Sequence, residues 1–372
     1  MASSAIITGI GMVSSLGLTA QTSCAAARAG ISRARELDYF TQWSPVDGSI
    51  SPVVGHQIPL ITDGFEGDAR LARILGGAIS DLTTQLPNLP WGSEKLAWYL
   101  ALPDRYRMWR GAERVGVKKV REELLAAMEQ VPKDNTEFEA ARQFLGMVGR
   151  NSRIPGTINL KFVSRAGNCA LAECAKQALS DIAEKQVRYA IVAAVDSLLG
   201  EATLNWLTQT SRLKSPAVAT GLAPGEAGVA LCLQAAESNG REGVQPDLCL
   251  QAVHQSHEEN TLLSGKPVQG RALTELLEST ADKEGNWFVI DLNGEDYRAM
   301  EWGYALVRTK LDGYALTYPA VSFGDTGTAS PGVAVAVVRH AIRRGCAPCK
   351  RAVVLSTSDD TQRTGMIIEA VN

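Results

Sequence analysis

The feature of the sequence that most constrains its fold is an unbroken apolar segment, Tyr189–Val195. A strand that is apolar at every position is typical of a sheet covered on both faces. The segment before it, Cys169–Lys185, carries leucine, isoleucine and alanine on one stripe, which predicts a helix with one buried face. A buried helix followed by a doubly covered strand indicates a layered α/β fold.

Strands and helices alternate in the same way along the rest of the chain. We expect further strands at 5–13, 96–102, 157–163, 228–234, 248–253, 287–292, 352–356 and 366–371. We expect helices at 19–28, 69–86, 112–128, 136–148, 296–307 and 331–343, and an irregular stretch rich in Ser, Pro, Gly and Asp at 31–65. Because no linker interrupts the series, we expect one body with two similar halves, residues 1–245 and 246–372.

Charge and cysteine content argue against several classes of protein. Lys and Arg number 37, Asp and Glu number 40, and no basic tract stands out, which argues against nucleic acid or an anionic membrane as the main partner. No apolar run reaches the ~20 residues that a membrane-spanning helix needs. Seven scattered cysteines, an odd number, are typical of a reducing compartment. We therefore expect a cytoplasmic protein.

Four segments, in order, resemble β-ketoacyl-(acyl-carrier-protein) synthases of the thiolase superfamily. They are the opening strand and loop at 6–17, Asn168–Cys169 with the helix and strand that follow, the Gly-rich turn and strand at 224–231, and the turn and helix start at 324–332. The resemblance covers most of the chain and is weakest at a variable insertion, about 33–160. It implies the five-layered α/β/α/β/α thiolase fold.

The same resemblance implies partners and a pathway. Proteins of this family usually form a homodimer or a heterodimer with a related subunit, and they act in fatty acid or polyketide biosynthesis. An acyl carrier protein or an acyl-CoA is then an expected partner, and no cofactor or metal is expected. An unrelated protein partner is an alternative, because a fold does not fix a function.

Condensation in this family needs a cysteine nucleophile, two histidines and backbone N–H groups that bind the thioester oxygen. The family's spacing places the nucleophile at Asn168, and a slip of one residue places it at Cys169. Cys169 is therefore either an acyl-accepting nucleophile, favoured by the dipole at the start of a helix, or a small core cysteine. Cys174, five residues on, is expected to be a packing residue.

Other residues stand at the positions of the two family histidines. Asn293 follows the strand predicted at 287–292, where the first histidine is expected, and Thr328 replaces the second. Phe323 replaces the lysine usually found five residues before the second histidine. An asparagine donates a hydrogen bond but carries no exchangeable proton at neutral pH. Because losing one member of a catalytic unit costs orders of magnitude in rate, we expect no decarboxylative condensation.

The last loop, Ser356–Gly365, also departs from the family. Asp359 and Asp360 lie where the family has flexible glycines that gate the acyl channel beside an oxyanion N–H. Acidic groups next to a thioester oxygen oppose the charge that develops there. The plainer interpretation is a polar surface loop at a site that is no longer maintained.

The remaining candidate groups have weaker patterns. The four histidines, His56, His254, His257 and His340, fall outside the family's catalytic positions. His254 and His257 precede two glutamates, but a third well-placed metal ligand is missing, which favours a solvated loop. Cys346–Cys349 has C-x-x-C spacing, yet it follows a predicted helix instead of opening one. That position favours a loop pair without redox function.

Two functions fit these observations. The first is a non-condensing ketosynthase-like protein that acts as a partner, scaffold or acyl-binding subunit. The second is an active 3-oxoacyl-(acyl-carrier-protein) synthase or acyltransferase with Cys169 as nucleophile and Asn293 and Thr328 as hydrogen-bond donors. A stretch with Trp98–Tyr99 and Tyr106–Arg110 is the best candidate for a partner surface, because Trp, Tyr and Arg are common interface anchors. Packing within the protein is the alternative.

Overall fold

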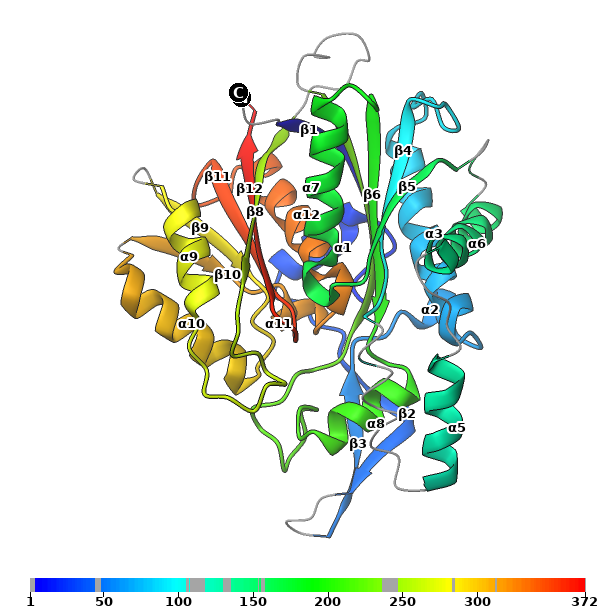
Figure 1. Ribbon diagram of the computed structural model, residues 1–372, viewed down its shortest axis with the longest axis vertical. Coiled ribbons are helices and arrows are strands. Elements are labelled where there is room, and N and C mark those ends of the chain that lie inside the picture. Colours follow the sequence, from blue (N-terminus) through cyan, green and yellow to red (C-terminus); the bar gives the residue numbers. More distant parts are fainter. Residues whose placement is uncertain are drawn as a thin grey trace.

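The computed structural model describes residues 4–43, 48–104, 107, 118–129, 135–152, 154, 158–235, 247–282, 285–311 and 313–371. Its main element is a sheet with the strand order β10-β9-β11-β12-β8-β1-β7-β6-β4-β5 (Figure 1). Its strands are β1 (Ala5–Ser14), β4 (Leu96–Ala101), β5 (Leu160–Ser164), β6 (Tyr189–Ser197), β7 (Glu226–Ala235), β8 (Leu248–His257), β9 (Asn286–Ile290), β10 (Tyr314–Thr317), β11 (Arg351–Thr357) and β12 (Gln362–Ala370). Each strand that the sequence predicts is present, and β10 is additional.

The strand order repeats between the two ends of the sheet. In each series, the strand that comes first in the chain pairs antiparallel with the strand that comes last in the chain. That last strand also pairs antiparallel with the strand that precedes it in the chain, and the two remaining pairings are parallel. The series are β1-β7-β6-β4-β5 and β8-β12-β11-β9-β10, and the antiparallel β1–β8 pair joins them. The boundary that we expect between residues 245 and 246 lies outside the described residues.

Two helices lie between the two series of strands. They are α7 (Ala170–Ala183) and α12 (Ser330–Arg343), which contact each other and strands of both series (Figure 1). Small residues let these helices pack closely: a Cβ on Gly332 of α12 would lie 2.9 Å from Leu171 of α7. The outer faces are covered by α3 (Gly67–Gln85) on one side and by α9 (Arg271–Thr280) and α10 (Asp296–Thr309) on the other. These layers confirm the expected α/β/α/β/α architecture.

The remaining helices are peripheral or short. They are α1 (Ala20–Arg28), α2 (Pro59–Thr62), α5 (Lys118–Glu129), α6 (Asn135–Ser152), α8 (Glu201–Gln209) and α11 (Ala320–Phe323). The helix predicted at 112–128 overlaps α5, although residues 112–117 lie outside the described residues. Among the described residues, no helix has the length and apolar character needed to cross a membrane.

The prediction of an irregular stretch at 31–65 is wrong. β2 (Arg35–Trp43) and β3 (Ile50–Gly55) form an antiparallel hairpin there. The hairpin is stable because Leu37, Phe40 and Val53 point inward and pack in one apolar cluster with residues of α8. The turn-forming residues of this segment obscured that alternation.

Two further predictions are corrected by burial and position. Trp98 and Tyr99 are fully buried in β4, so they do not form a partner surface. Of the second part of that stretch, only Arg107 is described. His254 and His257 lie on β8 and pair with β12, so they are part of the sheet instead of a solvated loop.

A buried histidine supplies a pH test of this fold. His56 is buried, its Nδ1 lacks a partner within the described residues, and burial lowers its pKa below the ordinary value of about 6.5. The unfolded chain therefore takes up a proton below pH ~6.5 that the folded chain does not. We expect the free energy of unfolding to fall as the pH drops from ~6.5. Urea denaturation of His56→Leu should show a shallower pH dependence; an unchanged slope would contradict this assignment.

Candidate functional site

Three strands of the sheet end at one place, and residues at their ends begin the site. Asp196 lies near the end of β6, Asp291 directly follows β9, and Thr357 ends β11. Two short 3-10 helices, η1 (Gly167–Cys169) and η3 (Gly327–Ala329), contact each other there and lead into α7 and α12. The site therefore combines residues from both halves of the chain.

The short helix η1 determines which candidate nucleophile faces the site. Asn168 lines a polar cavity, and its Nδ2 donates to Asp291 Oδ2 at 3.3 Å. Cys169 is fully buried, and its thiol donates instead to the carbonyl oxygens of Ser356 and Gln362, at 3.4 and 3.3 Å. Burial raises the pKa of Cys169 to about 12. The residue that faces the cavity at the start of this helix is thus an amide.

The residues at the two family histidine positions both make structural hydrogen bonds. Asn293 Nδ2 donates to Glu295 Oε2 at 2.8 Å and to Asp325 Oδ2 at 2.7 Å. Thr328 is fully buried, and its hydroxyl donates to the carbonyl oxygen of Leu102 at 3.3 Å. In this arrangement both side chains satisfy neighbouring groups of the protein.

An arginine–carboxylate cluster occupies the centre of the site. Its members are Arg107, Asp196, Arg212, Asp291, Glu295, Arg298, Asp325 and Asp359. Arg212 pairs with both Glu295 and Asp359, while Arg298 pairs with Asp291 at 2.6 Å and lies 3.6 Å from Asp359. Burial opposes ionisation of Asp359, but Arg212 and the other arginines outweigh it and hold the pKa of Asp359 well below its usual range.

Asp291 joins the start of the last loop to the cluster. Its Oδ2 accepts from the backbone N–H of Thr357 at 2.8 Å and from Arg298 at 2.6 Å. Thr357 ends β11 and belongs to the last loop, Ser356–Gly365. The backbone N–H of Cys169 is also engaged, since it donates to the carbonyl oxygen of Ala166 at 3.1 Å. Both N–H groups therefore have acceptors within the chain itself.

Two more carboxylates hold the N-terminus of η3. Asp325 Oδ1 accepts from the N–H of Gly327 at 2.8 Å, and Asp196 Oδ2 accepts from the N–H of Thr328 at 2.9 Å. Gly327 permits this approach, because a Cβ there would lie 2.2 Å from Asp196 Oδ2. Arg107 forms two hydrogen bonds to Asp196 and balances its charge. The positive end of this helix is thus saturated internally.

The cavities at the site are small. One of about 30 Å³ is lined by Asn168, Arg212 and Arg298. Another of about 20 Å³ is lined by Asp325 and by Phe323, the residue at the family's lysine position. A cavity measured in this way needs roughly 10–15 Å³ to hold one water molecule, so each of these two holds at most a few water molecules and not an acyl chain or a pantetheine arm.

Arg363 of β12 fixes the conformation of the last loop. Its Nη1 donates to the carbonyl oxygens of Ser358, Asp360 and Gln362 at 2.9, 2.7 and 2.7 Å. Its Nε donates to Glu301 of α10 at 2.7 Å. A single buried guanidinium therefore ties the loop backbone to a helix of the outer layer.

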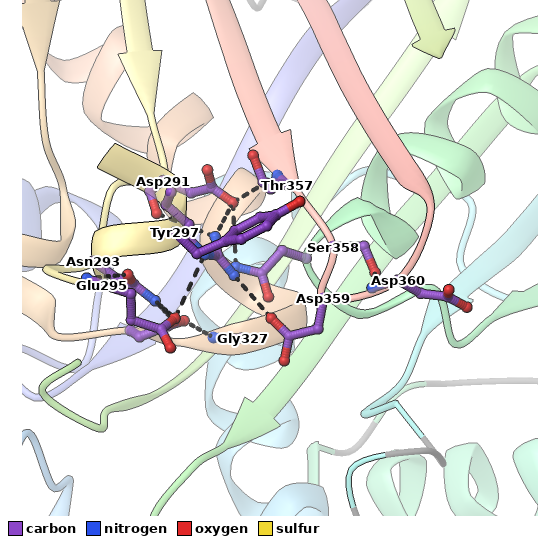
Figure 2. Close-up of polar contacts among 12 residues, drawn as sticks. Asp291, Asn293, Glu295, Tyr297, Gly327, Thr357, Ser358, Asp359 and Asp360 are labelled. Carbon is purple, nitrogen blue, oxygen red and sulfur yellow. Dashed lines mark hydrogen bonds and ion pairs between the residues drawn. The ribbon is translucent and has the colours of Figure 1, made fainter. Parts of the chain in front are cut away.

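The two aspartates of this loop lie differently, so the interpretation as a polar surface loop is wrong for one of them. Asp359 is partly buried and points into the cluster, whereas Asp360 is exposed and points away from it (Figure 2). Arg212 causes the difference, because its Nη1 and Nη2 both bind Asp359, at 2.8 and 3.0 Å.

Most members of the cluster were missed by reasoning from the sequence. A usable signal existed for two of them, since Asp196 and Asp291 each end an otherwise apolar strand. A carboxylate in that position is costly to bury unless it is paired or hydrogen-bonded. Arg212, Glu295 and Arg298 lie in ordinary polar contexts, and only the tertiary structure brings them to the site.

The other candidate residues from the sequence are not members of this cluster. His340 is on α12, and Cys346 and Cys349 follow that helix as free thiols, the first exposed and the second partly buried. Cys174 is fully buried on α7, as expected of a packing residue. Within the described part of the chain, no group of three or more His, Cys, Asp or Glu residues is placed to hold a metal ion.

Removing Arg298 tests the cluster directly. Arg298→Met leaves Asp291 without its main counter-charge, and we expect a loss of about 3 kcal/mol of unfolding free energy at pH 7. Burial already raises the pKa of Asp291. In the variant the folded state therefore binds a proton that the unfolded state releases, so stability should recover as the pH falls toward ~4. Asp291→Asn in the same background should abolish that recovery in urea titrations; a pH-independent Arg298→Met would contradict the assignment.

The comparisons with known proteins concern the fold. No protein-family model and no curated protein matches the chain. Solved structures do match: a type II PKS acyl-carrier protein in complex with its ketosynthase (AntDE:AntF, bound to the hexaketide) has a TM-score of 0.75 at 13% identity, covering all of both chains. The ishigamide ketosynthase/chain length factor has a TM-score of 0.73 at 15% identity, again covering all of both chains.

A third match is the ketosynthase from module 6 of the bacillaene synthase from Bacillus subtilis 168. Its TM-score is 0.72 at 12% identity, over 99% of this chain and 72% of that one. Identities this low establish the fold alone, and they agree with the repeated strand order and the two central helices. The chain is a divergent protein with the thiolase fold of ketosynthases.

Proposed function

We propose that this chain is a ketosynthase-like protein that does not carry out decarboxylative condensation and that acts as a partner or scaffold subunit. The observation that carries the proposal is the Asp291 carboxylate on the N–H of Thr357, with Asn168 beside it at the nucleophile position. The last loop supplies an oxyanion N–H in ketosynthases, and a carboxylate bound to this loop opposes the negative charge that an oxyanion develops. The residues at the histidine positions, Asn293 and Thr328, supply no proton at neutral pH.

The alternative, an active synthase or acyltransferase with Cys169 as nucleophile, has less support. The Cys169 thiol donates to two carbonyl oxygens, and burial raises its pKa to about 12, whereas an acyl acceptor needs a thiolate. The positive charge of Arg363 opposes this rise in the pKa of Cys169. The guanidinium of Arg363, however, already binds Glu301 and carbonyl oxygens of the last loop. We therefore assign Cys169 to packing.

A partner or scaffold role is favoured over an acyl-binding role. The cavities of about 20 and 30 Å³ offer no space for an acyl chain, and the charged groups beside them are paired within the cluster. Among the matched structures, one is a ketosynthase/chain length factor and another is a ketosynthase with its acyl-carrier protein. Those assemblies support a related subunit, or a second copy, as the proposed partner, with an acyl carrier protein as a further candidate.

The wider setting is part of the same proposal. We place the chain in the cytoplasm, in a fatty acid or polyketide assembly, and we divide it into two thiolase-like halves at residues 245 and 246. None of the seven cysteines forms a disulfide, and this and the repeated strand order support these assignments.

Thioester chemistry tests the proposal. The purified chain is incubated with octanoyl-CoA, with cerulenin, and with octanoyl- and malonyl-acyl carrier protein, and intact mass and released CO₂ are measured. We expect no adduct on Cys169 and no decarboxylation above the background of a Cys169→Ala control. An adduct that Cys169→Ala abolishes, together with a condensed product, would establish the enzymatic alternative.

A genetic comparison tests the scaffold role in the same host. Cys169→Ala should retain the cellular function of the wild-type gene, because packing tolerates the smaller side chain. Loss of that function by a Cys169→Ala protein with an unchanged melting temperature would refute the scaffold role.

A further inference from the structure

The outward face of α10 is apolar over three turns. Met300, Tyr304 and Val307 are 45%, 47% and 77% exposed, and Ala299 and Gly303 are exposed on the same face. These spacings of three and four residues place the side chains on one stripe. An exposed helix face normally carries charged or polar residues, so this stripe indicates a surface that another protein covers.

The neighbouring helix shows the ordinary pattern and serves as an internal comparison. α9 packs beside α10 on the outside of the C-terminal half (Figure 1). Its exposed residues are Arg271, Glu275, Glu278 and Ser279. The apolar stripe is therefore specific to α10 and is not a property of this whole surface.

Gly303 has no role in packing the single chain. A Cβ at this position would have no atom of the chain within 4 Å, and its φ is not positive. A glycine in a helix interior costs about 1 kcal/mol relative to alanine. A glycine in the middle of an exposed apolar stripe is explained if the backbone of a second helix approaches it closely.

The charges at the two ends of the stripe select the partner. Asp296 lies in the first turn of α10, and Lys310 directly follows its last residue; both side chains are exposed. If a second α10 packs antiparallel with Gly303 on the two-fold axis, Asp296 faces Lys310 of the second copy. In the same register Ala299 faces Val307 of the second copy. The stripe is thus complementary to itself in charge and in size, as an isologous interface requires.

We propose that α10 is a self-association surface, on which a second copy of this chain packs its own α10 antiparallel across Gly303. Opposed helix dipoles add to the attraction in this arrangement. This inference rests on the proposed partner role, for which it names the surface and the occupant. It does not involve the arginine–carboxylate cluster, so its tests are separate from the tests for condensation.

Charge insertion tests the surface. Met300→Glu and Val307→Glu should each weaken self-association by about tenfold or more, measured by sedimentation equilibrium, because they bury unpaired charge between the helices. Both sites are exposed in the single chain, so its melting temperature should stay unchanged. Ser279→Glu on α9 is the matched control and should leave association unaltered. A wild-type chain that stays monomeric, or association that all three variants retain, would overturn the proposal.

Charge reversal and cross-linking test the register. Asp296→Lys and Lys310→Asp should each weaken association, and the double variant should restore it; failure to restore would overturn the antiparallel pairing. In a Cys346→Ser/Cys349→Ser background, Gly303→Cys should give a covalent homodimer with a short bis-maleimide, whereas Glu278→Cys should not. Equal yields from both cysteines, or cross-links only to a different protein, would show that a second α10 is not the occupant.

Discussion

Replacing Arg363 with methionine is expected to lower the free energy of unfolding by about 5 kcal/mol, the upper end of the range for breaking a buried ion pair. Arg363 and Glu301 are almost completely excluded from water, with exposed fractions of 0% and 1% for their side chains. The substitution leaves the Glu301 carboxylate buried without its counter-charge. It also leaves three loop carbonyls and the Tyr297 hydroxyl without their donor.

Urea denaturation measures this loss, and two variants interpret it. Arg142→Met removes an exposed pair with Glu139 and should cost less than about 1 kcal/mol. Arg363→Met/Glu301→Leu removes both buried charges and should recover part of the loss, since a well-packed apolar pair can replace a buried ion pair. If Arg363→Met lowers the free energy of unfolding no more than Arg142→Met does, the Arg363 guanidinium does not fix the conformation of the last loop.

Cys169 is expected to react with a neutral alkylating agent at least about 10³-fold more slowly than an ordinary exposed thiol at pH 8. With a pKa of about 12, only about one thiol in 10⁴ is ionised at that pH, against roughly a quarter of thiols with the reference pKa of ~8.5. Burial also keeps the reagent away from the Cys169 thiol, because none of that side chain is exposed. Reactivity therefore separates a packing cysteine from a nucleophile.

The other cysteines of the chain supply the controls. Cys346 is exposed and should label first, whereas Cys174, fully buried on α7, should be as slow as Cys169. Iodoacetamide labelling followed by peptide mass spectrometry gives each rate in a single sample. Labelling of Cys169 at a rate close to that of Cys346 would mean that the Cys169 thiolate is stabilised. That result would favour the enzymatic alternative over the proposed function.

If the proposed function is correct, the cluster explains how a ketosynthase fold is kept without condensation chemistry. Charges are costly to bury, and each partner in the cluster offsets the desolvation of the others. Arg212 and Arg298 connect the loop after α8, the turn after β9 and the last loop, which come from both halves of the chain. These paired groups hold the loops of the site together.

Local pattern was enough to determine the layered fold. The apolar run at Tyr189–Val195 and the one-sided helix before it become β6 and α7 within a few residues, because periodicity reports burial directly. The sequence pattern gave a wrong prediction at 31–65, because turn-forming residues there obscure the hairpin of β2 and β3. It also misplaced Trp98 and Tyr99, because a one-dimensional pattern does not distinguish an aromatic anchor from a core residue.

The family resemblance predicts which residues stand at the catalytic positions, and it does not predict what those residues contact. Asn293, Phe323 and Thr328 are assigned by the resemblance, which places the family's histidines and lysine relative to a predicted strand and to the glycines near Thr328. Only the tertiary structure decided that Asn168 and not Cys169 lines the cavity, and that Asp291 lies on the N–H of Thr357. The physical reason is that an ion pair between residues far apart in the chain leaves no periodic trace, since its energy depends on geometry and burial that only the folded chain creates.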